Sequence, residues 1–344
     1  MLTEETKLFK GVGAAIEPGM SVRDVLVASG LNWDVNTTTF QYEAPLGLQD
    51  SGKFGTLAAY RSDNSKLLTV IGKGWKPYQN RQLIKDFFTF CHQSNLTPDW
   101  AGFISRKPNS RSHLAQNMAF VSAQIPEEQG GVFHLSPDEV INSRVVFFNH
   151  HTYGYGAGGY LLTCRQICTN GMTLTVKETS RLISHIQSQI DDRDRIIEVL
   201  NSMMQALNEY NQNLTKLAET PITPEEALVI LIKDFGFPGK ELKNQPRIVQ
   251  TCLNLFLGYF DDEMREQGVE LGTSTLAAYR TAYGLLQSVT AYRTHLTTKS
   301  SSTSQVLSMF NGDSAKVMNR AYRSLVKMTR SHKTITVPVG VRTI

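Results

Sequence analysis

Residues 196–217 read IIEVLNSMMQALNEYNQNLTKL, and their apolar side chains recur at alternating steps of four and three. The members of this seam are Ile196, Leu200, Met203, Leu207, Tyr210, Leu214 and Leu217. Such a pattern is typical of a helix that packs along its length against another helix. Three repeats leave open whether the partner belongs to a second subunit or to the same chain. We predict one long helix over about residues 178–219.

Strand patterns dominate on the N-terminal side of this helix. Residues 56–61 and 66–72 flank the turn-like tetrad Ser62-Asp63-Asn64-Ser65, which predicts a hairpin. Residues 81–93 place apolar side chains three and four apart and predict a helix. Further strands are predicted over residues 100–105, 117–125, 143–149, 160–164 and 172–176.

Helical patterns dominate on the C-terminal side. Thr223 and Glu226 form a capping box, with Pro224 at the first helical position, and this helix ends near Gly236. Further helices are predicted over about residues 246–266, 274–296 and 314–330, and the Ser/Thr-rich residues 297–305 predict a flexible connection. The sequence therefore predicts an α+β fold. An antiparallel sheet-based region spans residues 1–177, and a helical region with one long helix spans residues 178–344.

Composition narrows the class of protein. The chain has 344 residues, of which 41% are hydrophobic and 19% charged, as in globular proteins of one large or two ordinary domains. No apolar run approaches the ~20 residues that cross a bilayer, and MLTEETKLFKGVG at the N-terminus lacks the apolar stretch of a secretory signal. The four scattered cysteines fit reduced thiols. We expect a cytoplasmic protein without membrane contact.

The net charge of +4 is unevenly distributed. Residues 181–270 hold 9 Lys/Arg and 15 Asp/Glu, whereas residues 271–344 hold 10 and 1. The predicted C-terminal helix carries its cations along one face: Lys316, Arg320, Arg323, Lys327 and Arg330. This quarter of the chain is expected to meet an anionic partner, most obviously nucleic acid, or the acidic middle of the same chain.

The first candidate binding segment is GKGWKPYQN at residues 72–80. Lys73 and Lys76 bracket Trp75, and Tyr78 follows. Lysines neutralise phosphates and aromatic rings stack on bases, so this alternation is typical of single-strand binding. The alternative is a strand-to-helix turn in which Trp75 and Tyr78 belong to the core. The spacing of a phosphate-binding P-loop is absent.

Two further segments carry candidates. The basic loop RKPNSRSHLAQ at residues 106–116 holds Arg106, Lys107 and Arg111, which could follow a phosphate backbone or be solvated. The stretch NHHTYGYGAGGYLLTCRQICTNG at residues 149–171 is expected to form a glycine-rich hairpin tip. That tip would present Tyr153 and Tyr155, with Arg165 beside them, to a polymeric ligand.

The same stretch also invites a zinc interpretation through His150, His151, Cys164 and Cys168. The spacing argues against it, because two thiols four residues apart on an extended strand lie ~13 Å apart. A cysteine–histidine nucleophile is equally weak, since no oxyanion-stabilising feature accompanies it. We expect no metal, no cofactor and no catalytic residues.

Several blocks resemble one family, the phage/plasmid-like proteins classed as domain of unknown function 932. They are SVRDVLVASGLNWDV at residues 21–35, VIGKGWKPYQNRQLIKDF at residues 70–87, YGLLQSVTAYRTH and FNGDSAKVMNRAYRSL. Residues 149–171 add a fifth block through Asn149, His151, Arg165, Cys168 and Asn170. The family's SHDG sequence is replaced here by HHTYGYG.

The resemblance implies a phage, prophage or plasmid setting, and analogy of fold suggests a remote relation to single-strand annealing recombinases. We therefore expect a non-enzymatic homo-oligomer that binds single-stranded DNA and promotes annealing. Phosphates would contact Lys73, Lys76, Arg106, Lys107, Arg111 and Arg165, and bases would stack on Trp75, Tyr78, Tyr153 and Tyr155. One alternative is a protein-binding module, such as an inhibitor of a host-defence enzyme or an assembly factor. A nuclease is the other alternative, although the carboxylates of the β-rich half are dispersed.

Overall fold

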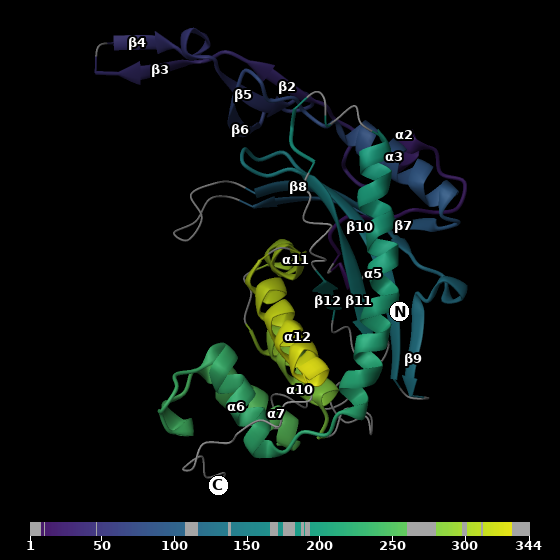
Figure 1. Cartoon of the computed structure of the whole chain (residues 1–344). Coiled ribbons are helices and arrows are strands. Elements are labelled where there is room, and N and C mark those ends of the chain that lie inside the picture. Colours follow the sequence, from purple (N-terminus) through teal and green to yellow (C-terminus); the bar gives the residue numbers. More distant parts are fainter. Residues whose placement is uncertain are drawn as a thin grey trace.

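The largest element of the fold is an antiparallel sheet of seven strands (Figure 1). The computed structural model describes residues 8–9, 11–45, 47–106, 116–136, 139–165, 171–174, 183–186, 189, 193–259, 280–297, 301–310 and 312–331. The strand order is β1-β7-β8-β10-β11-β12, and β9 also pairs with β10. The strands are β1 (Ala14–Ala15), β7 (Thr97–Arg106), β8 (Gln116–Gln124), β9 (Val132–Ser136), β10 (Glu139–His150), β11 (Ala157–Arg165) and β12 (Gly171–Leu174).

One face of this sheet is covered by α3 (Asn80–Gln93) and α5 (Arg193–Glu219). Side chains alternate along a strand, so Val145 and Phe147 of β10 share a core with these helices. All seven residues of the heptad seam are buried in that core. The seam contacts the sheet and α3, α10 and α12 of the same chain. Of the two alternatives for its partner, the structure supports the one within the chain.

The opposite face is covered by α11 (Ser302–Phe310) together with Leu8 and Phe9. Val146 and Phe148 of β10 point to this side and pack in a second core with Phe310. Strand β10 is therefore buried on both faces, which explains why the four consecutive residues 145–148 are all apolar.

A smaller sheet of β2 (Val35–Thr38), β5 (Thr56–Arg61) and β6 (Leu67–Gly72) has its own core around Trp33. The pairing of β5 with β6 confirms the predicted hairpin. A two-stranded hairpin, β3 (Gln41–Ala44) with β4 (Gly47–Asp50), projects away from the body (Figure 1).

The remaining helices are α2 (Val22–Ala28), α6 (Pro224–Phe235), α7 (Arg247–Leu257), α10 (Ala282–Ala291) and α12 (Asp313–Ser331). Short 3-10 turns occur at Ser51–Phe54, Glu127–Gln129 and Leu242–Asn244, and a π-helical turn, Tyr292–Leu296, continues α10. The capping box is confirmed, since Glu226 N–H donates to Thr223 Oγ1 and Thr223 N–H to Glu226 Oε2. The α+β class is therefore confirmed. One core joins these helices to the sheet, and the predicted boundary near residue 177 lies outside the described residues.

Three predicted segments differ from the structure. Residues 183–186 are not part of the long helix, because Ile183 forms an antiparallel bridge with Ala157. Helix α7 ends at Leu257, where Gly258 adopts a left-handed conformation with φ of 84°. The Ser/Thr-rich stretch becomes helical from Ser302, since burial of Val306, Leu307 and Phe310 against the sheet outweighs its polar composition.

Candidate nucleic-acid interface

Two segments predicted to bind nucleic acid meet at one end of the large sheet. One runs from β6 to α3, and the other is the turn between β10 and β11. His185 joins them: its carbonyl accepts from Lys76 N–H at 2.9 Å, and its Nδ1 lies 3.1 Å from the Lys76 carbonyl. Its Nε2 lies 2.7 Å from the carbonyl of His150. The sequence separates these residues by up to 109 positions.

Beneath this junction lies a buried group that we call the polar cluster: Asn80, Asn117, Asn149, His150, His151 and His185. Asn80 Nδ2 donates to the carbonyls of Leu31 and Trp33 at 3.1 and 3.2 Å. Its Oδ1 therefore accepts from His151 Nε2 at 2.8 Å, which places the proton of His151 on Nε2. Asn149 Nδ2 donates to the carbonyl of Tyr78 at 2.6 Å. The cluster thus fixes the backbone of both candidate segments.

The histidines of the cluster are held in the neutral form. Burial lowers the pKa of both His150 and His151 to about 3, and the neighbouring His185 adds to the shift. Burial also lowers the pKa of His185, although its two carbonyl contacts oppose that effect. The cluster is therefore a neutral hydrogen-bonding framework near pH 7.

Above the cluster lies the segment 72–80. Some of its side chains that were predicted to bind a strand are exposed, and others are buried. Lys73 and Lys76 are exposed. Trp75 is half-buried, and its ring stacks on His185 with centroids 4.7 Å apart. Tyr78 is fully buried, and its hydroxyl donates to Asp86 Oδ2 at 2.7 Å. The prediction that Tyr78 stacks on a base is wrong, because its ring belongs to the core beneath α3.

The two tyrosines of the turn between β10 and β11 are exposed beside these residues. Tyr153 is 55% exposed, and its N–H donates to Thr69 Oγ1 of β6. Tyr155 is 36% exposed, and its ring lies 5.0 Å from that of His150. The structure therefore brings together five predicted residues, which we call the strand-end patch: Lys73, Trp75, Lys76, Tyr153 and Tyr155.

The remaining predicted cations are not among the residues that the structure brings together in the patch. Lys107 and Arg111 lie outside the described residues, as does the side chain of Arg106. The strand that follows them starts beside the patch, because Asn117 at the start of β8 donates its N–H to Thr152 Oγ1 at 3.1 Å. Arg165 does not join them. Strand β11 begins opposite Asn149 and ends with Arg165 opposite Ile141, roughly 26 Å along the strand.

The three zinc candidates that the structure describes do not converge. The His150 ring packs on Phe148 at 5.4 Å, whereas the His151 ring packs on Trp33 at 5.2 Å. Cys164 pairs with Asn142 far along β11, and Cys168 lies outside the described residues. In the part of the chain that the structure describes, no three His, Cys, Asp or Glu side chains are grouped to hold a metal ion.

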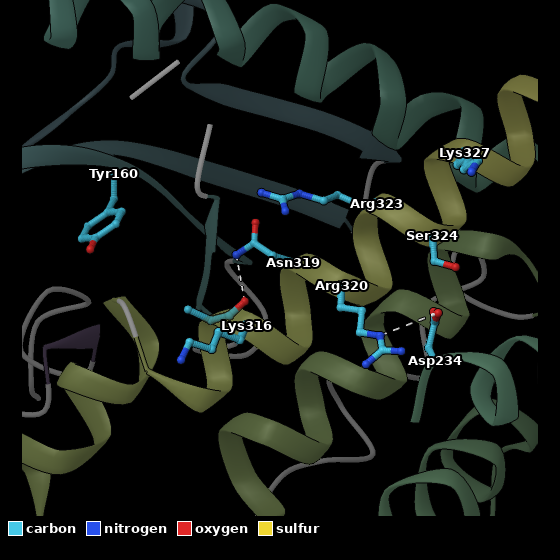
Figure 2. Close-up of a pocket in the computed structure, with 9 residues that line it drawn as sticks. Tyr160, Asp234, Lys316, Asn319, Arg320, Arg323, Ser324 and Lys327 are labelled. Carbon is cyan, nitrogen blue, oxygen red and sulfur yellow. Dashed lines mark hydrogen bonds and ion pairs between the residues drawn. The ribbon is translucent and has the colours of Figure 1, made fainter. Parts of the chain in front are cut away.

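A second candidate surface lies on α12 (Figure 2). Four cations of the predicted stripe line a pocket of about 620 Å³ together with side chains of β11 and α6. The lining residues of this α12 pocket are Tyr160, Asp234, Ala315, Lys316, Asn319, Arg320, Arg323, Ser324 and Lys327. Part of the stripe also meets the acidic middle of the chain, as the alternative expected: Arg330 Nη2 lies 2.6 Å from Glu209 Oε1, and Arg320 Nε lies 3.9 Å from Asp234 Oδ1.

Sequence reasoning missed three residues of these surfaces. His185 stands alone, without periodicity or a motif. Asp234 reads as an ordinary helix residue, and Tyr160 follows a glycine pair that predicted only a hairpin. The α12 cations had a clear signal in their spacing, but the pocket depends on the elements that face them.

Comparisons with known proteins place most of these residues within one family. No helix among the described residues is both long and apolar enough to span a membrane. Searches of curated proteins and of solved structures found no match. A family model described as "Domain of unknown function (DUF932)" matches residues 67–333, which include both candidate surfaces. Since this match covers most of the chain, the protein belongs to the DUF932 family.

Proposed function

We propose that the protein binds single-stranded DNA and promotes the annealing of complementary strands during phage recombination or replication. One observation carries the proposal: two distant segments predicted to bind a strand form a single patch over a buried, hydrogen-bonded polar cluster. A backbone fixed in this way would present its cations and rings on one surface before the strand arrives. We also propose that it acts in the cytoplasm and that it forms a homo-oligomer, the latter by analogy with annealing recombinases.

The chemistry of the strand-end patch fits this ligand. Lys73 and Lys76 offer exposed ammonium groups to phosphates. The rings of Tyr153 and Tyr155 are accessible for stacking, which contributes ~1–3 kcal/mol per base and tolerates any sequence. Annealing needs no covalent step, only a surface that holds a strand with its base edges free.

A protein-binding module is the alternative function, but the structure removes one of the two observations that favoured it. The heptad seam suggested a partner helix in another molecule, yet every seam residue is buried inside this chain. The charge segregation still fits a protein partner.

The test compares strand binding by the wild-type protein with that of Lys73→Ala/Lys76→Ala. Lys85→Ala/Lys216→Ala is the matched control, because it removes two exposed helical lysines from α3 and α5 on the other side of the sheet. We expect the wild type to shift single strands in preference to duplex and to lose affinity steeply with added salt. The patch variant should bind about tenfold more weakly than the control. Equal binding by both variants, or wild-type affinity indifferent to salt, would refute the proposal.

A further inference from the structure

The cations of the α12 pocket form a row that fits a linear polyanion. Lys316, Arg320, Arg323 and Lys327 are exposed on one face of α12, and the row extends roughly 16 Å along the helix axis. A single phosphate group would occupy only part of that length. A nucleic-acid strand would place several phosphates along it, since neighbouring phosphates are ~3.4 Å apart along the axis of stacked DNA.

The row also differs from an ordinary solvated helix face, because it borders a hollow. Tyr160 reaches the pocket from the sheet, and Asp234 reaches it from α6. In Figure 2 the guanidinium of Arg323 points toward the Tyr160 side of the pocket, whereas Arg320 turns toward Asp234. Within the described part of the chain, Asp234 is the one acidic side chain that lines the pocket. Among the described residues that line the pocket, four cations therefore face one carboxylate.

Ring contacts connect this pocket to the strand-end patch along one face of the sheet. Tyr160 stacks on Phe148 with centroids 4.4 Å apart, and Phe148 contacts His150 at 5.4 Å. His150 in turn lies beneath Tyr155, 5.0 Å from its ring. Tyr160 and Tyr155 therefore lie on the same side of the sheet, the side that α11 covers.

We propose that the α12 pocket is a second binding site for the phosphodiester backbone of the same single strand, with its four cations as phosphate contacts. This inference rests on the proposed function and adds a separate part of the binding path. On this inference the basic face of α12 contacts the DNA strand, rather than being only solvated.

The experiment measures binding of a fluorescent oligothymidylate over a range of salt concentrations. The variant is Lys316→Ala/Lys327→Ala, which leaves the Arg320–Asp234 pair in place. The control is again Lys85→Ala/Lys216→Ala, with the same charge change. We expect the pocket variant to bind about tenfold more weakly, and its salt slope to fall by about 1.4, since each contact to a single strand contributes ~0.7. Equal thermal unfolding of the two variants would show that both are folded.

The outcomes separate this inference from the proposed function. If the pocket variant matches the control while Lys73→Ala/Lys76→Ala binds weakly, the pocket is not on the strand path and the proposed function stands. If the wild type binds no strand, both proposals fall. Excess thymidine triphosphate should displace little oligonucleotide from the wild type. Strong displacement that the pocket variant abolishes would identify a free-nucleotide site and overturn the strand assignment.

Discussion

The strand-end patch and the α12 pocket both offer cations to an anionic ligand, but the fold builds them in different ways. The patch depends on residues from four separate stretches of chain, held by buried amides and neutral imidazoles. The row of cations in the pocket comes from one helix, and these cations are exposed. Changes beneath the patch should therefore damage folding and binding together, whereas changes in the pocket should alter binding alone.

Mild acid should give the largest effect, and it should act on the polar cluster. The folded-state pKa of His150 and His151, about 3, lies below the ordinary value of about 6.5. Their contribution to stability is thus complete above pH 6.5 and is lost as the pH falls toward 3. At pH 5 the lowered pKa of each of these two histidines reduces the free energy of unfolding by about 2 kcal/mol. The total should therefore drop by about 4 kcal/mol relative to pH 7.

Denaturant unfolding at pH 7 and pH 5 measures this loss. Carboxyl groups with ordinary pKa values near 4 are still mostly ionised at pH 5, so they contribute little over this interval. Equal unfolding free energies at the two pH values would show that the buried histidines do not control stability.

Removing one amide from the polar cluster should have the next largest effect. Asn80→Ala leaves His151 and two backbone carbonyls without their partner, which should destabilise the protein by about 3 kcal/mol. Asn254→Ala, at an exposed position of α7, should change stability by less than about 0.5 kcal/mol. Chemical denaturation compares the two, and a similar loss in both would argue against the cluster's role.

Replacing Gly159 with a larger residue tests how closely β11 packs against α5. A Cβ there would overlap the end of the Met203 side chain of α5, so Gly159→Val should cost about 2 kcal/mol through overpacking. Met203→Ala should recover part of that loss in the double variant. An additive loss in a double-mutant cycle would contradict the contact.

The smallest effect on stability should come from the pocket. Lys316→Ala/Lys327→Ala should shift the free energy of unfolding by no more than about 0.5 kcal/mol, because both lysines are exposed. Thermal unfolding measures it. A loss as large as that of Asn80→Ala would mean that the row serves the fold rather than a ligand.

Much of the fold could be predicted because it depends on local periodicity. The seam from Ile196 to Leu217 identified the buried side of α5 correctly. The tetrad at residues 62–65 predicted the β5–β6 hairpin, and Thr223 with Glu226 predicted the start of α6. Each of these signals lies within a few residues of the structure that it specifies.

The rest depends on contacts that no local pattern records. Tyr78 was predicted to stack on a base because it follows Trp75 and Lys76, with a core position as the alternative. The structure supports the alternative, since Tyr78 contacts Asp86 in the core beneath α3. His185 appeared to belong to a helix, although its backbone and ring bind two other segments. The glycines of residues 149–171 were expected to form a hairpin tip that faces a ligand, but Gly159 lies within β11 and packs closely against Met203 of α5.

The projecting β3–β4 hairpin has a practical consequence. Its base is closed by two hydrogen bonds between Phe40 and Ser51, and none of the described residues 41–45 and 47–50 belongs to any of the three cores. A fluorophore or affinity tag inserted at its tip would therefore sit apart from the packed interior. Such a reporter could follow assembly on DNA without altering the surfaces in question.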